Sequence, residues 1–101
     1  MSTHQHIRFS VKKEAIEDVK KLIKNYANHV SKYAKEHDEE WTWSKYQSKD
    51  SPTEFVSVIS HQDAAAERRH IATDETRIFA KNLYKHVTHS EQVTYELVAS
   101  G

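Results

Sequence analysis

The side chain with the clearest capacity for chemistry in this sequence is His70, in the stretch DAAAERRHIAT of residues 63–73. We expect a helix to begin at Asp63. His70 would then share one helix face with Ala66 and Thr73, because residues three or four apart lie side by side on a helix. Imidazole changes charge near neutral pH, so a histidine on that face could act as a general base. The alternative is a histidine that fills the seam between helix and sheet and hydrogen-bonds to the backbone.

Two tryptophans and a phenylalanine are candidate walls of a binding site. Trp41 and Trp43 lie two residues apart in WTWSKY, a stretch typical of a strand, so their rings share one strand face. Phe55 lies on the next predicted strand. Large planar rings could stack on a flat ligand, but they could equally fill the core between the sheet and its helices.

Other chemistries find little support in the sequence. The stretches HQH at residues 4–6 and HVTH at residues 86–89 each hold two histidines, but neither has a third ligand at a metal-binding spacing, so no metal site is predicted. The chain has no cysteine, which excludes disulfides, thiolate catalysis and cysteine-ligated metals. Its one glycine is the last residue, which excludes glycine-rich phosphate loops. No cofactor is predicted.

Length and charge narrow the class of protein further. The 101 residues are expected to form one domain, residues 1–101, with a small core, since only 20 of them are Leu, Ile, Val or Phe. Lys and Arg balance Asp and Glu at 15 each, so no positive field indicates a nucleic acid or an anionic membrane as partner. No apolar run approaches the ~20 residues of a membrane span, and the N-terminus lacks the pattern of a signal peptide. We therefore expect a cytoplasmic protein.

Hydrophobic periodicity predicts the elements that must position these side chains. Alternating apolar and polar residues indicate a strand over residues 4–12, and a change to steps of three and four indicates a long amphipathic helix over residues 13–37. Asp63 is predicted to cap a second helix, which breaks and is capped again at Thr73. The other predicted segments are strands over residues 41–46, 54–61 and 92–100, a turn over 48–53, a helical continuation to about residue 87 and a polar connection over 88–92.

The order β-α-β-β-α-β is typical of a ferredoxin-like α+β fold, with a four-stranded antiparallel sheet and both helices on one face. The strand over residues 54–61 carries apolar side chains on both faces, Phe55 on one and Val58 on the other. The face away from the helices must therefore be covered as well. We expect a homodimer in which two sheets face each other across a two-fold axis and enclose a cavity, a dimeric α+β barrel.

Residues 54–79 resemble the antibiotic-biosynthesis-monooxygenase domain family of small dimeric α+β barrels. In that family a strand ends in an acidic turn, followed by an alanine-containing helix, a histidine and a small hydroxyl residue where the helix bends. The matching residues here, after the strand FVSVI, are Asp63, Ala66, His70 and Thr73. Members often carry a Glu where this chain has Ile59. The element order and lengths agree over essentially the whole chain.

The resemblance implies oxygenation of a small electron-rich aromatic, such as a quinol or phenol, by O₂ without metal or flavin. A phenol must lose its proton before its anion can pass an electron to O₂, and a dry cavity must keep reactive intermediates from water. In this reading His70 is the base or orients the substrate, with Trp41, Trp43 and Phe55 as apolar walls.

Other functions stay open. The haem-degrading branch of the same fold uses an Asn on the first strand, which this chain lacks over residues 4–12, so haem degradation is not expected. One alternative is a barrel that binds a small ligand, or serves in a stress response, without catalysis. The other is a related isomerase or lyase.

Overall fold

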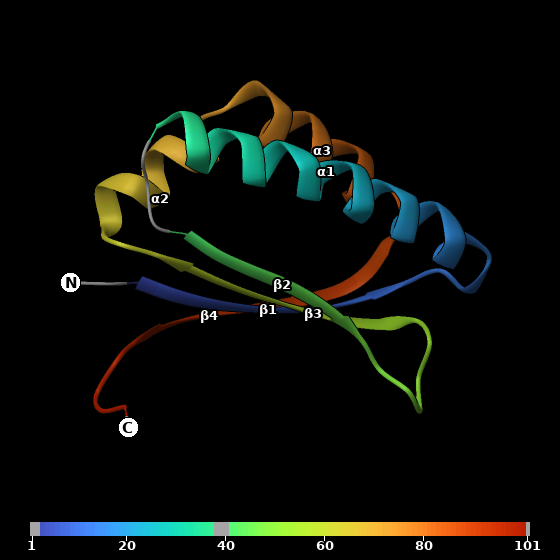
Figure 1. The fold of residues 1–101 in the computed structure, drawn as a ribbon. Helices are drawn as coiled ribbons and strands as arrows, with labels where there is room; N and C mark the ends of the chain where they lie inside the picture. The colour runs from blue at the N-terminus through green and yellow to red at the C-terminus, as the bar shows by residue number, and fades with distance from the viewer. Residues whose placement is uncertain (1–2, 38–40, 101) are drawn as a thin grey trace.

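The sheet of this protein has four antiparallel strands in the order β2-β3-β1-β4, and the helices cover one of its faces (Figure 1). The computed structural model describes residues 3–37 and 41–100, and of residues 3 and 41 the backbone alone. The elements in chain order are β1 (Thr3–Val11), a 3₁₀ turn (Lys13–Ala15), α1 (Ile16–Glu36), β2 (Trp41–Gln47), β3 (Glu54–His61), α2 (Ala64–Ile71), α3 (Asp74–Tyr84) and β4 (Val87–Glu96). This architecture confirms the ferredoxin-like α+β fold.

The core begins on the two central strands. Phe9 of β1 pairs with Phe55 of β3, and their rings stack with centroids 5.4 Å apart. Val19 of α1 and Leu83 of α3 belong to the same buried cluster, so helices and sheet share one core. Burying a side chain of this size stabilises the fold by roughly 1.5–3 kcal/mol.

The long helix α1 forms because its apolar residues recur at helical spacing. Val19, Tyr26 and Val30 lie on one face and are buried, while the charged residues between them are mostly exposed. The helix predicted over residues 13–37 is confirmed, except that its first turn is 3₁₀. Tyr26 carries its hydroxyl group into the interior.

Two side-chain caps set the direction of the segment that carries His70. The Asp63 carboxylate accepts a hydrogen bond from the backbone N–H of Ala66 at 2.8 Å and begins α2. The Thr73 hydroxyl accepts from the N–H of Thr76 at 3.3 Å and begins α3. Both caps were predicted, and the bend between the two helices directs His70 toward the sheet.

The C-terminal part of the chain corrects the sequence prediction. The helix ends at Tyr84, and β4 already begins at Val87, so residues 88–92 are strand and not a polar connection. They pair with β1, with Glu91 opposite Arg8. The prediction was wrong because these residues are polar. They can be polar within a strand because β4 lies at the edge of the sheet and most of its residues are exposed.

The face of the sheet away from the helices holds both polar and apolar side chains. Val93 and Tyr95 of β4 are 47% and 49% exposed. The His6 ring packs edge-on against Tyr95 with centroids 4.8 Å apart. His4 Nδ1 lies 2.7 Å from the Ser60 hydroxyl. The two histidines of the HQH stretch therefore make surface contacts on this face.

Candidate active site

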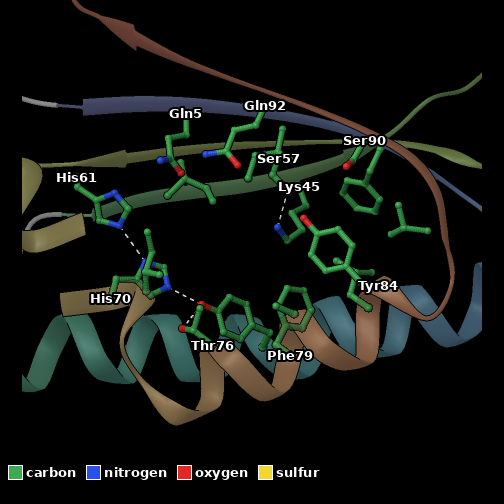
Figure 2. Close-up of a pocket in the computed structure, with 18 residues that line it drawn as sticks. Gln5, Lys45, Ser57, His61, His70, Thr76, Phe79, Tyr84, Ser90 and Gln92 are labelled. Atoms are coloured by element: carbon green, nitrogen blue, oxygen red, sulfur yellow. Dashed lines mark hydrogen bonds between the residues drawn. The ribbon is translucent and has the colours of Figure 1, made fainter. Parts of the chain in front are cut away.

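A cavity of about 280 Å³ lies between the helix-covered face of the sheet and the helices (Figure 2). Its floor is formed by inward side chains of all four strands, among them Gln5, Lys45, Ser57 and Gln92. Apolar surface dominates its wall, with residues such as Ile7, Ile59, Phe79 and Leu83. Its size approaches the lower end of the range for small-molecule sites.

His70 stands at one end of this cavity, at the C-terminal end of α2 (Figure 2). Its side chain is buried, and the residue is 3% exposed. His70 Nδ1 lies 2.9 Å from His61 Nε2 on β3, and His70 Nε2 lies 2.5 Å from the hydroxyl of Tyr26 on α1. The inward orientation expected for His70 is therefore present, and both of its ring nitrogens lie within hydrogen-bond distance of side chains.

A row of hydroxyl groups continues from His70 along the helices. The Tyr26 hydroxyl lies 2.6 Å from the Thr76 hydroxyl, which lies 2.7 Å from that of Thr73. Thr73 also donates to the backbone carbonyl of His70 at 2.9 Å. The residue that caps α3 therefore also fixes the helix end that carries the histidine.

The pKa values of these groups follow from burial. Burial is the largest cause that lowers the pKa of His70 to about 3, and the positive charges that His61, His29 and Lys45 can carry act in the same direction. Burial also raises the pKa of Tyr26, although its hydrogen bond with Thr76 opposes this shift. His70 is therefore neutral near pH 7. A neutral imidazole has one donor and one acceptor nitrogen, so Tyr26 and His61 take opposite roles toward it.

Lys45 is the residue that the sequence prediction missed. It extends from β2 into the cavity, and its Nζ donates a hydrogen bond to the Ser57 hydroxyl at 2.5 Å (Figure 2). The same Nζ lies 5.1 Å from the Trp43 ring centroid and 5.6 Å from that of Phe79. Burial lowers the pKa of Lys45 to about 8. The sequence feature that could have identified Lys45 is its position two residues after Trp43, which places the lysine on the same strand face as the tryptophans.

Two of the predicted wall residues, Trp43 and Phe55, lie behind the cavity lining. Trp43 meets the Tyr26 ring edge-on at 6.2 Å, and its buried Nε1 has no hydrogen-bond partner within the described residues. Phe55 lies in the core against Phe9, which does line the cavity. The Trp41 side chain lies outside the described residues.

The position of His70 corrects a second expectation. The sequence prediction placed the imidazole in a chamber between two facing sheets. The cavity that His70 lines lies instead within the single chain, on the helix side of its sheet (Figure 2). On the inward face of β3 the small Ser57 lies between Phe55 and Ile59, which leaves space beneath the helices. A second chamber between two facing sheets stays a prediction.

Neither a metal cluster nor a membrane helix is found in the described ranges. No group of three His, Asp or Glu side chains within residues 3–37 and 41–100 is placed to hold a metal ion. Within the same ranges, no helix has the length and apolar character to cross a bilayer.

Solved structures with this fold include named oxygenases. The chain is 22% identical to a structure described as an antibiotic biosynthesis monooxygenase, over 96% of this chain and 99% of that one, with a TM-score of 0.79. It is 18% identical to SnoaB, described as a cofactor-independent oxygenase from Streptomyces nogalater, over 98% and 95%, with a TM-score of 0.78. A conserved protein from Methanosarcina mazei Go1 is 18% identical over 94% and 91%, with a TM-score of 0.79. These likenesses establish a shared fold.

Comparison of the sequence alone finds no relative: no family model and no curated protein matches this chain.

Proposed function

We propose that this protein is a cofactor-independent monooxygenase that oxidises a small electron-rich phenol or quinol with O₂ inside the cavity. The observation that carries the proposal is the cavity of about 280 Å³. Most of its wall is apolar, and His70 and Lys45 are among the polar residues that line it. The shared fold with structures described as an antibiotic biosynthesis monooxygenase and a cofactor-independent oxygenase supports it.

The reaction needs no bound redox group if the substrate itself is the reductant. A phenolate passes one electron to O₂, and the resulting radical pair combines to a peroxide at carbon. Loss of water from the peroxide leaves a new carbonyl, so one oxygen atom enters the product and the other leaves as water. The apolar wall favours this route because it keeps bulk water from the radical and peroxide.

We assign His70 the role of orienting the substrate. Its imidazole is neutral and is fixed between Tyr26 and His61, so the ring forms a rigid wall at the end of the cavity, against which a substrate can be positioned. Trp43 supports the wall through Tyr26, and Phe55 supports it through Phe9. Trp41 stays a proposed wall residue on the same strand.

We further propose that the protein works as a homodimer joined through the open face of the sheet. Val93 and Tyr95 remain half exposed there, and Tyr46 is 57% exposed. Val58 on the central strand β3 alternates with the inward Ser57 and so projects to this same face. Exposed apolar groups on a sheet face that no helix covers are typical of an interface.

One observation favours a second candidate, a barrel that binds a small ligand without catalysis. Both ring nitrogens of His70 are engaged by side chains, and its pKa of about 3 is far below that of an efficient base at neutral pH. A protein that only binds aromatics would need no proton acceptor.

Oxygen uptake separates the two candidates. Purified protein would be mixed with anthrone or 1,4-naphthoquinol in an oxygen electrode, against a protein-free background. We expect uptake above background, reduced at least about tenfold in His70→Ala, with His37→Ala as the control because His37 is exposed at the end of α1. Binding of these compounds without oxygen, combined with no uptake in air, would leave the binding protein as the better description.

A further inference from the structure

Lys45 occupies a position where a lysine is unusual. It lies on the inward face of β2, between sheet and helices, and its ammonium group borders the cavity (Figure 2). Lysines on strands commonly point to solvent, because an ammonium group loses hydration free energy on burial. A strand that turns a lysine inward therefore needs a partner for its charge.

The described residues give that charge only weak partners. The Ser57 hydroxyl accepts one hydrogen bond from Nζ, and the faces of Trp43 and Phe79 attract the cation. No carboxylate lies within 4.0 Å of the Lys45 Nζ in the described part of the chain, and none lines the cavity. Ile59, two residues along β3 from the Ser57 that pairs with Lys45, lines the cavity with an apolar side chain.

The other titratable groups around the cavity do not replace a carboxylate. They come from each layer that packs on Lys45: His61 from β3, Tyr26 from α1, His70 from α2 and Tyr84 from α3. β1 and β4 contribute the uncharged amides of Gln5 and Gln92. Glu67 accepts a hydrogen bond from Gln5, but Glu67 is not part of the lining. None of the lining groups is an anion at neutral pH.

We propose that Lys45 is the proton acceptor and oxyanion-binding group of this cavity, and that the cavity takes flat aromatic rings bearing an oxyanion in preference to neutral ones. In the free protein a neutral Nζ lone pair takes the proton of a phenol. The O–H bond breaks, the N–H bond forms, and a phenolate and an ammonium group result. An aryl carboxylate meets the same group without giving up a proton, so the protein takes one from solvent instead. The inference rests on the cavity being the ligand site, as the proposed function does.

The charge state of Lys45 suits this role better than that of His70. With its pKa lowered to about 8, Lys45 has both neutral and charged forms populated near neutral pH. A phenol such as a tyrosine side chain has a pKa near 10 in water, and a neighbouring ammonium group lowers that value. His70 would have to become a buried cation beside His61, which burial disfavours.

The test compares an anion with its neutral counterpart in the absence of oxygen. Isothermal titration calorimetry would measure 2-naphthoate and 2-naphthamide, which share the ring system and differ in charge. We expect wild-type protein to bind naphthoate at least about tenfold more tightly, the factor that follows if the bound anion raises the lysine pKa by about one unit. Equal affinity for the two compounds, or no binding of either, would overturn the inference.

Substitution identifies the group responsible. Lys45→Met should remove the preference for naphthoate and leave naphthamide binding unchanged, because methionine keeps the length and removes the charge. Lys49→Met is the matched control, since Lys49 is exposed in the turn after β2. A preference for naphthoate that survives in Lys45→Met would assign the anion site to another group. Lys45→Gln gives a second neutral variant should the methionine protein fold poorly.

The number of protons taken up on binding distinguishes a functional role of Lys45 from a purely structural one, because a structural role would cause no proton uptake. At pH 8, binding of naphthoate should take up about half a proton per site, read from titrations in two buffers of different ionisation enthalpy. No uptake in wild type would contradict the inference. Two outcomes separate this inference from the proposed oxygenase function. If naphthoate binds but phenols cause no oxygen uptake, only the oxygenase function is rejected. If Lys45→Met leaves oxygen uptake unchanged, only the role of Lys45 is rejected.

Discussion

The hydroxyl of Tyr26 on α1 lies 2.5 Å from Nε2 of His70 on α2, and this contact links two helices at the end of the cavity. The two rings are also nearly parallel, with centroids 6.0 Å apart and an angle of 13° between their planes. Tyr26 stacks on Phe79 of α3 as well, at 4.2 Å. One residue of α1 therefore holds both short helices in place over the sheet.

Removing the Tyr26 hydroxyl should destabilise the protein. Tyr26→Phe keeps the stacked rings but leaves His70 and the Thr76 hydroxyl without this partner in a buried site. We expect the free energy of unfolding in urea to fall by about 1–3 kcal/mol. Tyr84→Phe is the control, because Tyr84 is 57% exposed and should change little. If Tyr26→Phe lowers the free energy of unfolding no more than Tyr84→Phe does, the buried hydrogen bonds of the Tyr26 hydroxyl do not stabilise the fold.

The stability of the fold should fall in acid through His70. Its pKa is about 3 in the folded protein and near 6.5 in an unfolded chain, so below pH 6.5 the unfolded state binds the extra proton. The contribution of this group is complete above pH 6.5 and is lost as the pH falls toward 3, by up to about 1.4 kcal/mol per pH unit. Urea unfolding of wild type and His70→Gln at pH 5 and pH 7 measures the effect. The variant should show the smaller difference between the two pH values, and identical differences would place the ring in solvent.

Much of the architecture could be predicted from local patterns. The strand predicted over residues 54–61 has the observed bounds of β3, and the capping side chains of Asp63 and Thr73 marked both helix starts. The edge strand β4 was harder, because an edge strand keeps polar residues on both faces and lacks the alternation of a half-buried strand.

The site was predictable only in part, and the reason is geometric. Helical spacing was enough to turn His70 inward. The spacing of Trp43 and Lys45 places both on one strand face, but a period of two does not say which face the helices cover. A lysine beside tryptophans fits an open face as well as an inner one, and only the packing of α1 and α3 decides between them.

Substitution on the open face of the sheet should weaken self-association. Val58→Glu places a carboxylate in the centre of the proposed interface, on β3 between Ser44 and His6. We expect sedimentation to show a wild-type dimer at micromolar concentration and a dissociation constant at least about tenfold higher in the variant. Ile78→Glu on α3 is the control, because Ile78 is 60% exposed on the helix layer. A wild-type protein that sediments as a monomer would remove the dimer from the proposal.

The most direct test of the central claim follows the oxygen atoms. Anthrone would be incubated with the protein under ¹⁸O₂ in ordinary water, and the product analysed by mass spectrometry. The account predicts protein-dependent formation of the quinone product with one ¹⁸O atom in its new carbonyl group. A product that forms no faster than without protein, or whose new oxygen comes from water, would contradict it.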